Sequence, residues 1–280
     1  MRRFLFRCFL WLLLLFVLEG GMYLTGFRFA TFNGKEVFRS IDLSKKKTGK
    51  GLLILGDSVC QQLYPSQQEY PDAVSLACNQ AVTMAGQFFL MRNYLEANAA
   101  ALPRKVVFVC TPLCLQNDVD RYAFQYFLKP FYTKEYRPFF NEMLMDRVRK
   151  IPHYRASRLP FVRVSNFTFA YEESEVSYSL ISPLSRSYLR QMDSLAASKG
   201  VSFSLVCAPV RESERNAVGI ACEGAAERNE LTPALLDSYR NGIVSYPDSL
   251  FRDERHFRKE CIPDDPCHLF TQETRELLIP

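Results

Sequence analysis

The chain has 280 residues, and its 35 Lys and Arg against 30 Asp and Glu give a formal charge of +5. This length predicts one large α/β domain with a full core rather than two domains of ordinary size. Most of the positive charge is spread out, and the sequence has neither a Gly-Lys-Ser/Thr phosphate loop nor a basic-aromatic repeat, so we expect no nucleic acid partner. The nine cysteines form no Cys-x-x-Cys pair and lie away from histidines at ligand spacing, so no metal site is predicted.

The first predicted element is an apolar segment at 1–26. Three arginines precede an uninterrupted apolar run over 8–18. The run alone has the length of a signal peptide, whereas its extension through Leu24 would be long enough to cross a membrane. Because no convincing small-x-small cleavage site follows, we expect an uncleaved signal-anchor; a cleaved signal peptide and a buried helix are the alternatives. The arginines should stay in the cytoplasm, so the rest of the chain would face the outer side of the membrane.

Residues 27–50 are polar, contain several lysines and show no clear periodicity, which predicts a linker. Residues 51–58, GLLILGDS, then form an apolar strand that stops at a small, acidic, hydroxyl-bearing turn. Such a strand places Ser58 at the carboxyl edge of a sheet, where open α/β sheets bind their ligands. Ser58 is therefore the candidate nucleophile, and free N–H groups of the following helix would stabilise an oxyanion. The alternative is an ordinary strand-ending turn.

Two further strands are expected to end at the same edge. Residues 73–86 predict a short strand that ends near Asn79, followed by small residues, Gly86 and a helix. Residues 105–112, KVVFVCTP, are apolar and β-branched and predict a central parallel strand, with Asn117 in the loop after it. The alternative roles are structural, because Gly86 would permit close helix packing and Asn117 would suit a turn.

Residues 122–182 are aromatic and basic, and they are long for a connection inside a compact α/β domain. Such a segment indicates a lid or a binding insertion. Its aromatic rings would stack on sugars or sit at a bilayer surface, with arginines meeting anionic head groups. The alternative is a helical subdomain that buries its own aromatic residues.

The second half of the chain continues the alternation of helix and strand that is typical of a doubly wound sheet. Residues 185–199 have helical spacing and end before Gly200, 201–210 predict a buried strand, and 242–246 predict a last edge strand. The strand count is then five, all parallel.

The C-terminal region contains two Asp-x-x-His motifs, Asp253 with His256 and Asp265 with His268. In either motif, the carboxylate would orient one ring nitrogen while the other faces the serine. We favour the first pair because it follows directly from the predicted edge strand. The second pair stays open, because a closing helix directly after His268 also fits. A disulfide between Cys261 and Cys267 is expected if this part of the chain is exported.

Together these blocks resemble the SGNH (GDSL-type) hydrolase superfamily, which opens with a hydrophobic strand running into Gly-Asp-Ser and carries Asp-x-x-His near its C-terminus. The resemblance covers residues 52–280, and the segment 122–182 departs from it. It implies a three-layer α/β/α, flavodoxin-like domain over 51–280 with a five-stranded parallel sheet. It also implies the roles of Ser58 as nucleophile, His256 as base and then acid, Asp253 as orienting group, and Gly86, or Asn79, and Asn117 as oxyanion donors.

Membrane-anchored members of this superfamily include accessory proteins of cell-envelope polysaccharide acylation. The resemblance therefore implies a serine esterase or O-acyltransferase that acts on an acylated envelope glycan or a small ester through an acyl-serine intermediate, alongside a membrane acyl-transfer partner. No metal or organic cofactor is implied. The alternative is a catalytically inactive envelope assembly protein that keeps the fold and binds glycan or lipid.

Overall fold

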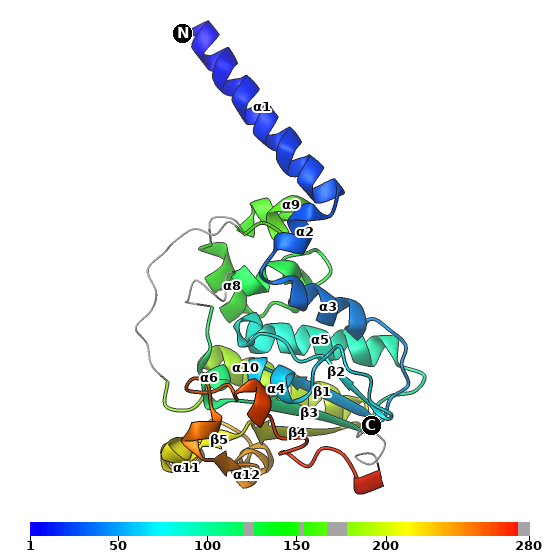
Figure 1. Ribbon diagram of the computed structural model, residues 1–280, viewed down its shortest axis with the longest axis vertical. Helices are drawn as coiled ribbons and strands as arrows, with labels where there is room; N and C mark the ends of the chain where they lie inside the picture. Colours follow the sequence, from blue (N-terminus) through cyan, green and yellow to red (C-terminus); the bar gives the residue numbers. More distant parts are fainter. Residues whose placement is uncertain (120–125, 152–153, 167–177, 274–280) are drawn as a thin grey trace.

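The computed structural model describes residues 1–119, 126–151, 154–166 and 178–273 of the chain (Figure 1). Parts of the segment 122–182 therefore lie outside the described residues. The body contains a four-stranded parallel sheet in the order β2-β1-β3-β4. Its strands are β1 (Leu52–Gly56), β2 (Ala73–Ser75), β3 (Lys105–Cys110) and β4 (Ser202–Cys207).

The chain changes direction across the sheet at β1. β2 pairs with one side of β1, and β3, the next strand in the sequence, pairs with the other side. In an open parallel sheet, such a switch point forms a crevice outside the carboxyl ends of the strands concerned. Ser58 follows β1 and Thr111 follows β3, so both lie at this crevice.

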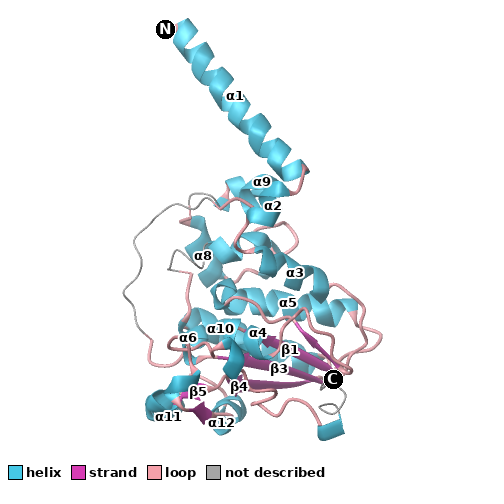
Figure 2. Cartoon of the chain, viewed as in Figure 1, coloured by secondary structure: helices cyan, strands magenta, loops and turns pink. Residues whose placement is uncertain are grey.

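Alternate residues of β1 face two different cores, as the pleat of a strand requires. Leu53 and Leu55 belong to a core shared with α5 and α10, whereas Ile54 belongs to a second core shared with α4 and the C-terminal segment. Helices thus flank the sheet (Figure 2), which confirms the predicted α/β class. The helices around the sheet are α3 (Lys35–Ser44), α4 (Ser58–Leu63), α5 (Thr83–Ala97), α6 (Pro112–Gln116), α10 (Pro183–Ser198), α11 (Arg215–Glu227) and α12 (Pro233–Asn241).

The predicted fifth strand does not join this sheet, so the expectation of five strands in one sheet was wrong. Residues 242–246 contribute β6 (Ser245–Tyr246), which pairs in parallel with β5 (Val210–Arg211) in a separate two-stranded sheet. β5 follows β4 closely along the chain, but Pro209 lies between them. Because proline has no N–H to continue a ladder, the sheet is interrupted at this residue and the new pair starts beyond it.

The segment 27–50 is mostly helical, in contrast to the irregular linker that its polarity suggests. It contains α2 (Phe27–Thr31) and α3, and α3 packs on α5. Val37 and Ile41 are four residues apart and both are buried in the core that α5 shares. This spacing is the helical signal in an otherwise polar sequence.

The N-terminal helix α1 (Arg2–Leu24) projects from the body and buries none of its residues (Figure 1). Its 23 residues have a peak mean hydropathy of 1.9, and it is the one helix in the described part of the chain that is long and apolar enough to cross a membrane. A signal sequence has the same properties. At about 1.5 Å per residue, the helix matches a hydrocarbon layer of roughly 30 Å.

The described part of the segment 122–182 buries much of its aromatic content. Phe131 and Tyr136 pack around Phe89 of α5, and each ring centroid lies 5.4 Å from that of Phe89. This arrangement agrees with the alternative expectation of a helical subdomain. Its elements are η2 (Lys129–Phe131), η3 (Arg137–Phe139), α8 (Glu142–Arg149), η5 (Ala156–Arg158) and α9 (Pro160–Arg163).

Any side chain in place of Gly56, at the end of β1, is predicted to destabilise the fold. A Cβ at this position would lie 2.2 Å from the carbonyl oxygen of Val109 and 2.3 Å from Cβ of Cys60. Both neighbours are fixed, one by the β3 backbone and the other by α4. Gly56→Ala should therefore lower the free energy of unfolding by about 3 kcal/mol, measured by urea denaturation.

The matched control is Gly219→Ala, within α11. A Cβ at Gly219 meets no atom within 4 Å, so the change should raise the free energy of unfolding by about 0.5–1 kcal/mol through helix propensity. Equal effects of the two substitutions would contradict the close approach at Gly56.

Candidate active site

The turn after β1 is organised by the side chain of Asp57, which is completely buried. Its Oδ1 accepts hydrogen bonds from the backbone N–H of Val59 at 2.9 Å and of Cys60 at 3.1 Å, so Asp57 caps the N-terminus of α4. Ser58 is consequently the first residue of that helix. Its N–H belongs to the first turn, where amides have no acceptor within the helix.

The second carboxylate oxygen of Asp57 connects two strands. Oδ2 accepts hydrogen bonds from both the N–H and the hydroxyl of Thr111, each at 2.7 Å. Thr111 directly follows β3, and its own hydroxyl also caps α6. One buried carboxylate thus fixes the carboxyl ends of β1 and β3 to each other, and four hydrogen bonds compensate its loss of water.

The structure brings Ser58, His256 and Asp253 together in one hydrogen-bonded chain. Ser58 Oγ lies 2.9 Å from Nε2 of His256, although 198 residues separate the two in sequence. Nδ1 of the same ring lies 3.0 Å from each carboxylate oxygen of Asp253. With Nδ1–H donating to the carboxylate, Nε2 is left to accept the proton of the Ser58 hydroxyl. This is the geometry by which a serine hydroxyl becomes a nucleophile.

Asp253 is held in its ionised form by the loop that carries it. Partial burial acts to raise its pKa, but the backbone N–H groups of His256 and Arg255 both donate to Oδ1, and the side chains of His256 and Arg252 add further hydrogen bonds. The net result is a pKa well below the ordinary value for an aspartate. A carboxylate that stays charged throughout the neutral range can orient the imidazole and stabilise an imidazolium.

Gln62, on α4, connects the loop of His256 to the helix of Ser58, and sequence reasoning missed it. Its Nε2 donates to the carbonyl of Phe257 at 2.7 Å, and its Oε1 accepts from the N–H of Phe257 at 3.0 Å. The ring of Phe257 stacks on that of Phe251, with centroids 4.4 Å apart, and the two residues form a β-bridge. The loop 252–256 is therefore closed at its base and held against α4. A glutamine in a short helix carries no sequence signal for such a contact.

The residues predicted as oxyanion donors make structural contacts. Asn117, the C-cap of α6, donates from Nδ2 to the carbonyl of Gln80 at 3.1 Å. Asn79 caps η1 (Gln80–Val82) by accepting from Ala81 N–H. Gly86 lies within α5, where a Cβ would lie 3.1 Å from the ring of Phe131, so its observed use is close packing.

The first two turns of α5 hold two buried polar groups, Thr83 and Gln87. Gln87 donates from Nε2 to the carbonyl of Gly56 at 2.8 Å, while its Oε1 has no hydrogen-bond partner among the described residues. Thr83, four residues earlier, has φ 60° and ψ 173°, and its buried hydroxyl likewise lacks a partner in the described part of the chain. A β-branched residue in this conformation is strained, and such strain is concentrated at functional sites. The sequence gives no sign of it.

The second Asp-x-x-His motif is used differently. Asp265 is buried, and its carboxylate accepts from the Tyr64 hydroxyl at 2.6 Å and from the N–H groups of Leu269 and Phe270. His268 is exposed, with φ 49°. Asp265 therefore holds the C-terminal segment at Leu269 and Phe270 close to Tyr64, which follows α4.

The expected disulfide is absent, because Cys261 and Cys267 are both free thiols. Burial raises the pKa of Cys267 to about 12. Burial also raises the pKa of Cys60, Cys110 and Cys207 in the core, so these thiols stay protonated at neutral pH.

A cavity of about 380 Å³ opens beside the candidate site. It begins at Thr111, the partner of Asp57, and reaches Arg255, the neighbour of His256. Its wall between these two points is largely apolar and includes Leu113 and Val218. The cavity thus lies outside the carboxyl ends of β3 and β4, at the edge of the sheet where open α/β sheets bind their ligands.

Within the described residues, no group of three or more His, Cys, Asp or Glu side chains is arranged to hold a metal ion. No protein-family model matches the chain. The search of curated proteins likewise gives no match.

Gln62→Leu is predicted to slow the reaction of Ser58 with a fluorophosphonate about tenfold. The change removes two hydrogen bonds that hold the His256 loop to α4, each worth about 0.5–1.5 kcal/mol. Gln62→Glu, which keeps the acceptor for Phe257 N–H, should fall between the wild type and Gln62→Leu. A purely structural role for Gln62 would lower the melting temperature while leaving the labelling rate of the folded protein unchanged.

Proposed function

We propose that the protein is a serine esterase or O-acyltransferase of the SGNH type, which acts through an acyl-serine intermediate. The observation that carries the proposal is the hydrogen-bonded chain from Ser58 through His256 to Asp253. It joins the Ser58 hydroxyl, at the start of α4, to Nε2 of His256. Nδ1 of the same ring is bonded to Asp253, so Nε2 is available to accept the hydroxyl proton. The β1–β3 switch point and the adjacent apolar cavity support the proposal, because they supply a place for the substrate.

The reaction follows from this geometry. His256 Nε2 takes the proton of Ser58 as Oγ attacks the carbonyl carbon of an ester. The resulting oxyanion lies by the start of α4, where the Ser58 N–H and the helix dipole stabilise negative charge. His256 then gives its proton to the departing alcohol oxygen, which leaves the acyl group on Ser58. Attack by water completes hydrolysis, and attack by another hydroxyl completes transfer.

The substrate we propose is an acylated cell-envelope glycan or a small ester. An N-terminal apolar helix suits a protein that works at a membrane, with its body on the outer face. The apolar wall of the cavity suits an acyl group, and its rim carries Glu214, Glu254 and Arg255 for polar contacts. A membrane acyl donor fits the transfer variant of the reaction.

A second candidate is a catalytically inactive envelope protein that binds glycan or lipid with the same fold. The observation in its favour is that Asn117, Asn79 and Gly86 make structural contacts. An oxyanion site with one donor would stabilise the transition state less, by about 3 kcal/mol for each missing donor.

Labelling of the purified full chain with a fluorophosphonate distinguishes the two candidates. Wild-type protein should be labelled, and Ser58→Ala should abolish labelling without loss of stability. His256→Gln should slow labelling on the order of a thousandfold, because the hydroxyl then has no base. Asp253→Asn should follow His256→Gln in part.

His268→Gln is the matched control, and its labelling rate should remain close to that of the wild type. A severe effect of His268→Gln with a mild effect of His256→Gln would move the acid–base pair to the second motif. Wild-type protein that remains unlabelled while folded would support the binding function.

A further inference from the structure

Besides α1, elements of the body lie close to the C-terminal end of that helix, at Leu24. We propose that α9, α2 and the second half of α1 form a membrane-docking surface whose partner is an anionic lipid bilayer. Its apolar members are Leu24, Phe27, Phe29, Leu159 and Phe161, and its cationic members are Arg155, Arg158 and Arg163. The proposal stands apart from the catalytic function, because none of these residues belongs to the candidate active site.

The first observation is that α9 lies alongside α1 rather than below it. The ring of Phe161 meets the ring of Phe16 edge to face, with centroids 6.2 Å apart. Phe16 lies eight residues before Leu24, which is about 12 Å along the helix axis. A bilayer that covers α1 up to its last turn therefore also surrounds Phe161 of α9, which lies at the level of Phe16. The contact between the two helices fixes this relation (Figure 1).

The second observation is the composition of the segment around α9. Leu159 is 45% exposed, and Phe161 and Val162 are partly exposed. Arg155 and Arg158 are exposed on the preceding turn, and no acidic residue lies between 154 and 166. An apolar tip flanked by arginines suits the boundary between acyl chains and anionic head groups, where arginine side chains are attracted to the lipid phosphates.

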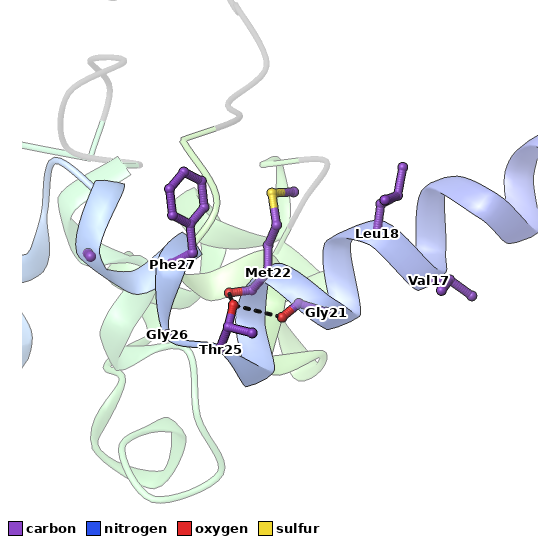
Figure 3. A pocket seen from close by; sticks show the side chains of 8 residues that line it. Val17, Leu18, Gly21, Met22, Thr25, Gly26 and Phe27 are labelled. Atoms are coloured by element: carbon purple, nitrogen blue, oxygen red, sulfur yellow. Dashed lines mark hydrogen bonds between the residues drawn. The ribbon is translucent and has the colours of Figure 1, made fainter.

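The third observation is the bend between α1 and α2. Gly26, with φ 74°, turns the chain so that Phe27, 58% exposed, continues the apolar surface of α1. Figure 3 shows Leu18, Met22 and Phe27 projecting to one side of this bend, beside a hollow of about 730 Å³. The hollow is open and mainly apolar.

The Thr25 hydroxyl and the Glu19 and Arg28 charges on the same surface have partners within the chain, which lowers the cost of placing them in a low-dielectric environment. The hydroxyl of Thr25 donates to the carbonyl oxygens of Gly21 and Met22, at 3.0 and 3.2 Å. Glu19, the one acidic residue of α1, forms an ion pair with Arg28 of α2 at 3.2 Å. This pair neutralises both charges and fastens α2 to α1.

Tryptophan quenching in vesicles of brominated phosphatidylcholine and phosphatidylglycerol tests the proposal with the full chain. The sole native tryptophan, Trp11, lies in α1 and reports insertion of that helix. In a Trp11→Phe background, Phe161→Trp should be strongly quenched by the brominated lipid, and Leu159→Trp should behave in the same way. The matched control is Ile220→Trp on α11, 68% exposed and at the opposite end of the body (Figure 1), which should not be quenched.

The charge contribution is tested in the same assay. Reversal of two arginines, Arg155→Glu with Arg158→Glu, should reduce the quenching of Phe161→Trp roughly twofold or more. Quenching of native Trp11 without quenching at either Phe161→Trp or Leu159→Trp would overturn the proposal, because the body would then stand clear of the bilayer. Equal quenching of the Ile220→Trp control would overturn it as well, because contact would then be unspecific.

Discussion

The buried carboxylate of Asp57 is the constraint on which the rest of the site depends. A charge without water is costly in the core, so each of its oxygens must be matched by donors. The chain supplies them from α4 on one side and from Thr111 on the other. Satisfying this one group therefore sets the start of α4, the spacing of β1 and β3, and the direction of the Ser58 side chain.

The imidazole reaches Ser58 through a different set of contacts, contributed by the end of the chain. Phe251 and Phe257 close the loop by stacking, and Gln62 holds the backbone of Phe257 to α4. The loop is thus positioned by apolar packing and by two hydrogen bonds to main-chain atoms. Neither contact involves the side chains of Ser58, His256 or Asp253, so the alignment of His256 is set by the fold itself.

The sequence predicted the local features of this arrangement well. Ser58 after an apolar strand and His256 three residues from Asp253 are patterns of short range, which can be read from neighbouring residues in the sequence. The contacts that were not predicted join distant segments and carry no local sequence pattern. Gln62 meets Phe257 across 195 residues of sequence, and the strand pair beyond Pro209 joins segments that lie far apart in the chain. The roles expected for Gly86 and Asn117 came from resemblance, and their surroundings depend on tertiary packing.

The thiols buried beneath the site have a consequence for the lifetime of the protein. Oxidants attack thiolates, and the core cysteines stay protonated as long as the sheet remains closed. Their oxidation can proceed only during rare openings of the folded body. In an oxidising compartment, the rate of cysteine oxidation would therefore follow the rate of unfolding. A sheet that opens slowly would protect the chain without any disulfide in its described part.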